Sequence, residues 1–152
     1  MKASKRFACL PYGKIEILIP QLMISESTYT MFSGKSSLAA KKGLRECNFD
    51  SCICRIFSME QLGTPVTEIE IKTEIPVVLK TSIVPVVQQI ALCEMKVNSS
   101  ILGMSLRKKG ITACRFCEDK IQYLVNIEKL LEQCMEENLN PAKDFVPEAK
   151  ND

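Results

Sequence analysis

The stretch VTEIEIKTEI, from Val66 to Ile75, alternates with a period of two residues, and this rhythm decides the fold. In an extended chain Ile69, Ile71 and Ile75 fall on one side, and the charged residues fall on the other. Such alternation is typical of a β-strand that is buried on one face only. We therefore expect the isoleucines to point into the core and the charges to face solvent.

More short strands are predicted around this stretch. The segments 77–84 and 86–97 are rich in β-branched residues, which favour strands, and Pro76 and Pro85 separate them because proline cannot donate a ladder hydrogen bond. Weaker patterns of the same kind occupy residues 14–24, 51–59, 101–107 and 111–117. The predicted fold is mainly β, a sandwich or partly open barrel of about six to eight short strands, with an α+β fold as the alternative.

The pattern changes after residue 118. From Asp119 to about Asn138 apolar residues recur at three- and four-residue intervals, at Leu124, Ile127, Leu131 and Cys134. This spacing predicts an amphipathic helix over about 119–138, which Asp119 is suited to cap. We expect a single β-rich domain over residues 1–138 that includes this helix, and a flexible polar tail over 139–152.

The composition excludes several classes of function. None of the 152 residues is histidine, which removes Ser-His-Asp and Cys-His catalytic groups and zinc sites that depend on histidine. A net charge of +2 lacks the excess of a typical nucleic-acid-binding domain. No apolar run approaches the roughly eighteen residues of a membrane span. We expect a soluble, intracellular protein with no nucleic-acid or membrane partner.

Cysteine is the unusual feature of the composition, with eight residues in the chain. Because the N-terminal residues lack the apolar region of a signal peptide, we expect most of the thiols to be reduced. The first interpretation is that they are small, buried core residues. Disulfides are the alternative, and they would suit a secreted or surface coat-type protein.

A zinc site is a second alternative for the cysteines. Cys114 and Cys117 have the spacing of one half of such a site, and Cys52 and Cys54 can supply the other half. Zinc binds four thiolates in a tetrahedron, which requires two close pairs to meet. This arrangement predicts a zinc-stabilised binding domain, and no other cofactor is expected.

A short segment has the ending of a phosphate-binding loop. It reads Ser33-Gly34-Lys35-Ser36, but Tyr29 stands where that loop requires its first glycine. The string from Met31 to Ser36, together with a late CxxC pair, resembles the thymidine kinase family locally. The resemblance implies that Lys35 and Ser36 bind the phosphates of a nucleotide, although the acidic segment with which that family binds magnesium has no counterpart here.

The strand content and the missing catalytic groups favour a non-enzymatic structural or protein–protein interaction module. The predicted contact surface is an exposed strand edge or the apolar side of the C-terminal helix, which carries Leu124, Ile127 and Leu131. The expected partner is another protein or a second copy of the chain. A nucleotide-binding protein that uses Lys35 and Ser36 is the competing hypothesis.

Overall fold

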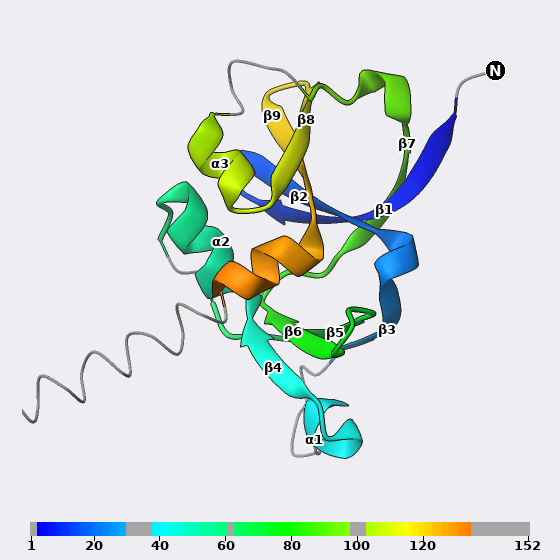
Figure 1. The fold of residues 1–152 in the computed structure, drawn as a ribbon, viewed down its shortest axis with the longest axis vertical. Helices are drawn as coiled ribbons and strands as arrows, with labels where there is room; N and C mark the ends of the chain where they lie inside the picture. Colours follow the sequence, from blue (N-terminus) through cyan, green and yellow to red (C-terminus); the bar gives the residue numbers. More distant parts are fainter. Residues whose placement is uncertain (1–2, 30–37, 61–62, 98–102, 135–152) are drawn as a thin grey trace, which may run out of the picture.

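The computed structural model describes residues 3–29, 38–60, 63–97 and 103–134, and within them nine strands form two sheets (Figure 1). The strands are β1 (Ser4–Tyr12), β2 (Ile15–Pro20), β3 (Ile24–Tyr29), β4 (Arg45–Asn48), β5 (Thr67–Ile71), β6 (Val77–Thr81), β7 (Val86–Ala91), β8 (Ile111–Cys117) and β9 (Lys120–Val125). The α-helices are α1 (Leu38–Lys42), α2 (Phe49–Phe57), α3 (Met104–Lys108) and a C-terminal helix that covers residues 127–134 of the described chain. The 3-10 helices are η1 (Gln21–Met23) and η2 (Leu92–Glu94). The predicted mainly β fold is confirmed, with nine strands in place of six to eight.

Sheet A has the strand order β7-β1-β2-β9-β8. Its centre is a parallel pair, in which Ile17 of β2 lies opposite Tyr123 of β9. The chain that follows β7 returns to the opposite edge, where the amide of Lys96 donates to the carbonyl of Cys114 over 2.7 Å and the amide of Cys114 donates back over 2.9 Å. Sheet A is therefore curled and closed in part by this single bridge.

Sheet B has the order β3-β5-β6-β4 and contains the stretch that decides the fold. Ile69 and Ile71 are buried, as predicted. Ile75 is 63% exposed instead, because β5 ends at Ile71 and Ile75 lies in the connection to β6. Glu68 is buried, where a solvent-facing charge was expected, and its Oε1 accepts a hydrogen bond of 2.9 Å from the amide of Leu38 at the start of α1.

The main core lies between the two sheets and is closed by α2 and the C-terminal helix (Figure 1). Leu10 from β1, Ile69 from β5 and Ile53 from α2 are all fully buried in it. A second, smaller core lies on the other face of sheet A and includes Phe7 and Ile90. Burial on both faces explains why the inner strands of sheet A are almost continuously apolar.

A buried polar network joins the two sheets through α2. Asp50, in the first turn of α2, accepts hydrogen bonds of 2.7 Å from the hydroxyls of Tyr12 and Thr81 and one of 2.9 Å from the amide of Ser82. Burial raises the pKa of Tyr12, and the charge of Asp50 adds to this effect. The Tyr12 hydroxyl therefore keeps its proton and remains a donor that holds β1 against α2 and β6.

Two predicted elements are wrong in type, and a third begins later than predicted. Residues 49–57 form α2 and not a strand, since the side chain of Asn48 accepts a hydrogen bond of 3.1 Å from the amide of Ser51 and so caps a helix. The stretch predicted as a strand over 101–107 includes the start of α3 in its described part.

The third correction concerns the predicted helix over 119–138. Residues Lys120–Val125 form β9, so Asp119 lies in the turn between β8 and β9 and caps no helix. The helix begins at residue 127, where Asn126 accepts a hydrogen bond of 3.2 Å from the amide of Lys129. None of the described helices is long and apolar enough to cross a membrane.

Candidate interaction surface

The residues predicted to form an interaction helix lie inside the protein. Ile127 and Leu131 are 3% and 4% exposed and belong to the main core. Leu124 lies on β9 and packs against the second core. The apolar side of the C-terminal helix is therefore covered, and as a contact surface this prediction is wrong.

The other predicted surface, a strand edge, is present at β7. This strand pairs with β1 on one side, with Phe7 opposite Gln88, and no described strand pairs with its other side. Val84, Val86 and Val87 are 52%, 58% and 55% exposed. Free main-chain groups beside exposed valines offer another strand both hydrogen bonds and apolar contact.

The edge of β7 differs in charge from the other sheet edges. Soluble proteins protect an edge strand with charged residues or proline. Among the edge strands of the described chain, β8 carries Arg115, β3 carries Glu26 and β4 carries Arg45 and Glu46. From Val84 to Cys93 no residue is charged, and the only such protection is Pro85 at the start of the strand. β7 is therefore the edge best suited to receive another strand.

The inner face of β7 is anchored, so the edge is presented on a fixed support. Ile90 is 2% exposed and belongs to the second core. Gln122 of β9 is fully buried and donates hydrogen bonds of 2.9 Å to Gln88 and 2.8 Å to Glu16. Lys120 completes the network with an ion pair of 3.1 Å to Glu16. Hydrogen-bonded networks of this kind, here centred on the buried Gln122, help to fix one arrangement of the strands.

Two titratable groups of this network have shifted pKa values. Burial raises the pKa of Cys9 to about 12, and the hydrogen bond that its thiol donates to Glu16 over 3.1 Å adds to the rise. Burial also acts to raise the pKa of Glu16, but hydrogen bonds from Gln122, Cys9 and Lys120 outweigh it and lower that pKa. Cys9 is thus a protonated structural thiol and no nucleophile near neutral pH.

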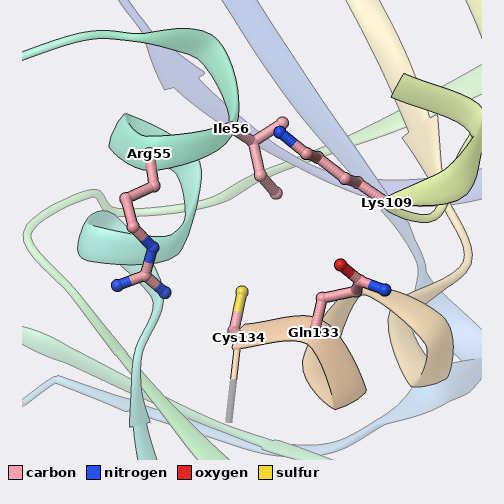
Figure 2. A pocket seen from close by; sticks show the side chains of 5 residues that line it. All are labelled: Arg55, Ile56, Lys109, Gln133 and Cys134. Carbon is pink, nitrogen blue, oxygen red and sulfur yellow. The ribbon is translucent and has the colours of Figure 1, made fainter. Parts of the chain in front are cut away.

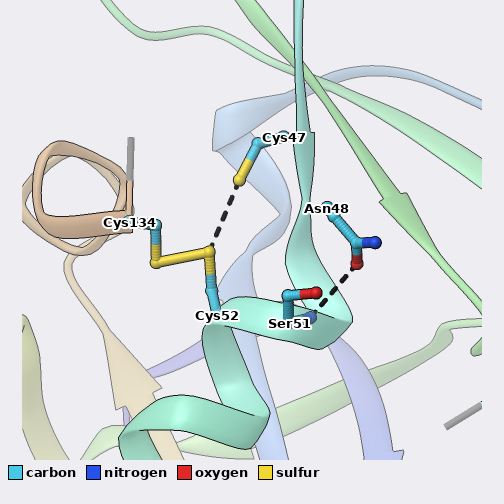
Figure 3. The surroundings of a disulfide bond; sticks show 5 residues. All are labelled: Cys47, Asn48, Ser51, Cys52 and Cys134. Carbon is cyan, nitrogen blue, oxygen red and sulfur yellow. Dashed lines mark hydrogen bonds between the residues drawn. A yellow bond between two sulfur atoms is a disulfide. The ribbon is translucent and has the colours of Figure 1, made fainter. Parts of the chain in front are cut away.

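The four cysteines predicted as zinc ligands occupy different surroundings. Cys52, on α2, forms a disulfide with Cys134 of the C-terminal helix, with 5.6 Å between the Cα atoms (Figure 3). Cys54 donates a hydrogen bond of 3.0 Å to the carbonyl of Glu60, Cys114 is buried on β8, and Cys117 is partly exposed at its end. In the part of the chain that the structure describes, no three His, Cys, Asp or Glu side chains are grouped as metal ligands.

The disulfide borders a small pocket of about 130 Å³. Figure 2 shows Cys134 and Gln133 on the C-terminal helix, Arg55 and Ile56 on α2, and Lys109 at the end of α3 around this space. Among the lining residues in the described part of the chain, Arg55 and Lys109 are cationic. Sequence reasoning missed this pocket because nothing in the sequence pairs Cys52 with a cysteine 82 residues away.

Lys35 and Ser36, which were predicted to bind a nucleotide, lie outside the described residues. The valines of β7 were predicted as part of a strand, but their exposure was not foreseen. A signal for it was present, since an uncharged stretch that begins with two valines directly after Pro85 suits an edge strand as well as a buried one.

Comparison with known proteins gives matches to solved structures and none to family models or curated sequences. No protein-family model and no curated protein sequence matches the chain. Among solved structures, the scaffolding protein TtCheW from Thermoanaerobacter tengcongensis superimposes with a TM-score of 0.57 over 83% of this chain and 86% of that protein. The two sequences are 9% identical, so the likeness concerns the fold alone. The two-sheet architecture described above is therefore that of a CheW-like fold.

Proposed function

We infer that the chain is a non-enzymatic structural module that joins protein chains by strand addition at the free edge of β7. The observation that carries this function is the combination of an unpaired edge, exposed valines and a complete lack of charge from Val84 to Cys93. Main-chain hydrogen bonds supply affinity in strand addition, and apolar side chains along the edge add to it.

The favoured occupant of this edge is a second copy of the chain. A two-fold antiparallel contact between two β7 strands brings no charge against another charge, because the strand carries none. The same contact partly covers Val86 and Val87, which point to opposite faces of the strand, in both copies.

The fold likeness supports a binding role. The similar solved structure is that of a scaffolding protein, and a module that links proteins needs a fixed surface more than reactive groups. Absence of histidine limits the catalytic routes open to the chain. The pKa values of the buried thiols Cys9 and Cys47 are raised to about 12 and about 11, which opposes nucleophilic use of both.

Sedimentation at increasing protein concentration tests the proposal. We expect the unaltered chain to form dimers, and Val87→Lys to weaken association at least about tenfold because it places a charge on the apolar edge. Ile75→Lys is the matched control, since Ile75 is a similarly exposed apolar residue, 63% against 55%, in the connection between β5 and β6. A chain that stays monomeric, or dimers that both variants weaken equally, would refute strand addition at β7.

A further inference from the structure

Three cysteines lie together where α2 meets the C-terminal helix (Figure 3). The sulfur of Cys47, at the end of β4, lies 3.5 Å from the sulfur of Cys52. Because Cys52 is disulfide-bonded and has no proton, the thiol of Cys47 is the donor in this contact. One sulfur of the disulfide thus has a hydrogen-bond donor directed at it.

The other sulfur of the disulfide borders the pocket described above. Cys134 is one of its lining residues, and Cys52 is not. The cationic side chains of Arg55 and Lys109 line the same space (Figure 2). A volume of about 130 Å³ suits a small molecule or part of one and not a folded domain. The ammonium group of Lys109 therefore favours a small, negatively charged ligand next to Cys134.

We propose that this pocket is a thiol–disulfide exchange site, in which a small anionic thiol attacks the sulfur of Cys134 and opens the Cys52–Cys134 disulfide. The thiolate of the small thiol forms a bond to the Cys134 sulfur while the Cys52–Cys134 bond breaks, and Cys52 leaves as a thiolate. A second molecule of the same thiol attacks the mixed disulfide. The products are the oxidised disulfide of the small thiol and two protein thiols, so two small thiols supply both electrons.

The position of Cys47 favours attack on Cys134 over attack on Cys52. Exchange is faster when the leaving sulfur is stabilised as a thiolate. The Cys47 thiol is in place to donate to the departing Cys52, and a hydrogen bond to a charged acceptor is stronger than one to a neutral acceptor. Burial raises the pKa of Cys47 to about 11, against a smaller opposing effect of Arg55, so Cys47 keeps the proton that it donates.

Opening this disulfide removes the covalent link between α2 and the C-terminal helix. The link joins two parts of the chain that are 82 residues apart. Leu130 and Leu131 still hold the helix in the main core by packing. Exchange at this site therefore changes how firmly the helix is held, independently of the β7 edge on sheet A.

The test compares reduction by glutathione, which is anionic, with reduction by 2-mercaptoethanol, which is neutral. The rate constants are measured on the full chain by mass spectrometry after acid quench and alkylation. We expect Lys109→Gln to lower the glutathione rate constant about fivefold and to leave the 2-mercaptoethanol rate constant unchanged. Lys108→Gln is the matched control, because Lys108 is the adjacent lysine and does not line the pocket. Equal effects of both variants, or no change in the ratio of the two rate constants, would overturn the role of the pocket.

Peptide mapping of the trapped intermediate tests the direction of attack. We expect the glutathione adduct on Cys134, and an adduct mainly on Cys52 would contradict the proposal. Cys47→Ala removes the donor and should slow reduction by both thiols, whereas Cys47→Ser keeps a donor and should restore most of the rate. If the two variants react alike, Cys47 has no part in the reaction. A purified chain with eight free thiols and no disulfide would refute the proposal as a whole and would leave the β7 proposal intact.

Discussion

The hydroxyl of Tyr12 offers a sharp test of how the two sheets are held together. Tyr12→Phe removes one of three donors to the buried Asp50 and leaves the ring in its place in the core. A hydrogen bond to a charged, buried acceptor contributes about 1.5–3 kcal/mol. We therefore expect a loss of about 2 kcal/mol in the free energy of unfolding, because Thr81 and Ser82 still donate to the carboxyl group.

Urea unfolding followed by circular dichroism measures this loss. For a domain of this size about 2 kcal/mol corresponds to a decrease in Tm of roughly 4–8 °C. Tyr123→Phe is the matched control, since Tyr123 is 6% exposed and its hydroxyl has no hydrogen bond to another described residue. That variant should lose less than about 0.5 kcal/mol.

A double-mutant cycle separates the hydrogen bonds from general effects on packing. Thr81→Val removes the second hydroxyl donor, which lies 3.0 Å from the hydroxyl of Tyr12. We expect the two substitutions to be non-additive by about 0.5–3 kcal/mol, because both hydroxyls act on one oxygen of Asp50. If Tyr12→Phe costs no more than Tyr123→Phe, or if the two substitutions are strictly additive, the network does not join the sheets as described.

Two further outcomes follow from the structure. Gly110→Ala should lower the free energy of unfolding in urea by about 2–4 kcal/mol, because Gly110 has a φ of +101° and an added Cβ would lie 2.8 Å from the amide nitrogen of Leu130. Gly103 has open space around it, so the control Gly103→Ala should change stability by less than about 0.5 kcal/mol. Equal losses in the two variants would refute the close contact at Gly110. The pKa of Glu16 is lowered in the folded chain, so the stabilisation by this group is complete above its ordinary value of 4.5 and is lost as the pH falls through the lower folded-state value. Unfolding curves from about pH 6 to about pH 3 should therefore be less dependent on pH for Glu16→Gln than for the unaltered chain, and identical dependence would show that the network does not act through Glu16.

The strands β5 and β6 of sheet B were predictable because their signal is local. The two-residue alternation identified β5 and the burial of Ile69 and Ile71. The same rule misplaced Glu68, since its burial depends on the amide of Leu38, which lies 30 residues away in the sequence. Alternation shows which face a residue occupies and gives no information on what covers that face.

The helices were misjudged where cap signals competed with apolar periodicity. The cysteines and isoleucines of 51–59 alternate like a strand, but Asn48 and Asp50 supply a helix start. In the C-terminal region the apolar pattern that predicted a helix began at Leu124, which lies on β9. The helix begins only after Asn126, whose side chain caps it, and this start was not recognised. In both cases a single polar side chain at the helix N-terminus marked the boundary better than the apolar pattern.

The candidate sites depend on contacts between distant parts of the chain. To predict that Val86 and Val87 are exposed, one must know that β7 lies at a sheet edge, and only the strand order gives that position. The pairing of Cys52 with Cys134 is equally hidden, because eight cysteines allow many pairings and spacing selects none.

The place of β9 in sheet A has a consequence for synthesis on the ribosome. β9 lies between β2 and β8, and it contacts β2 across 106 residues of sequence. A growing chain that has not yet reached residue 120 has no β9, so the edge of β2 with which β9 pairs stays open. Assembly must therefore wait for almost the whole domain to emerge, and such long-range pairing is slow. Until then the open edge of β2 can pair with a wrong strand, and chaperones that bind unfolded chains would be needed most during this period.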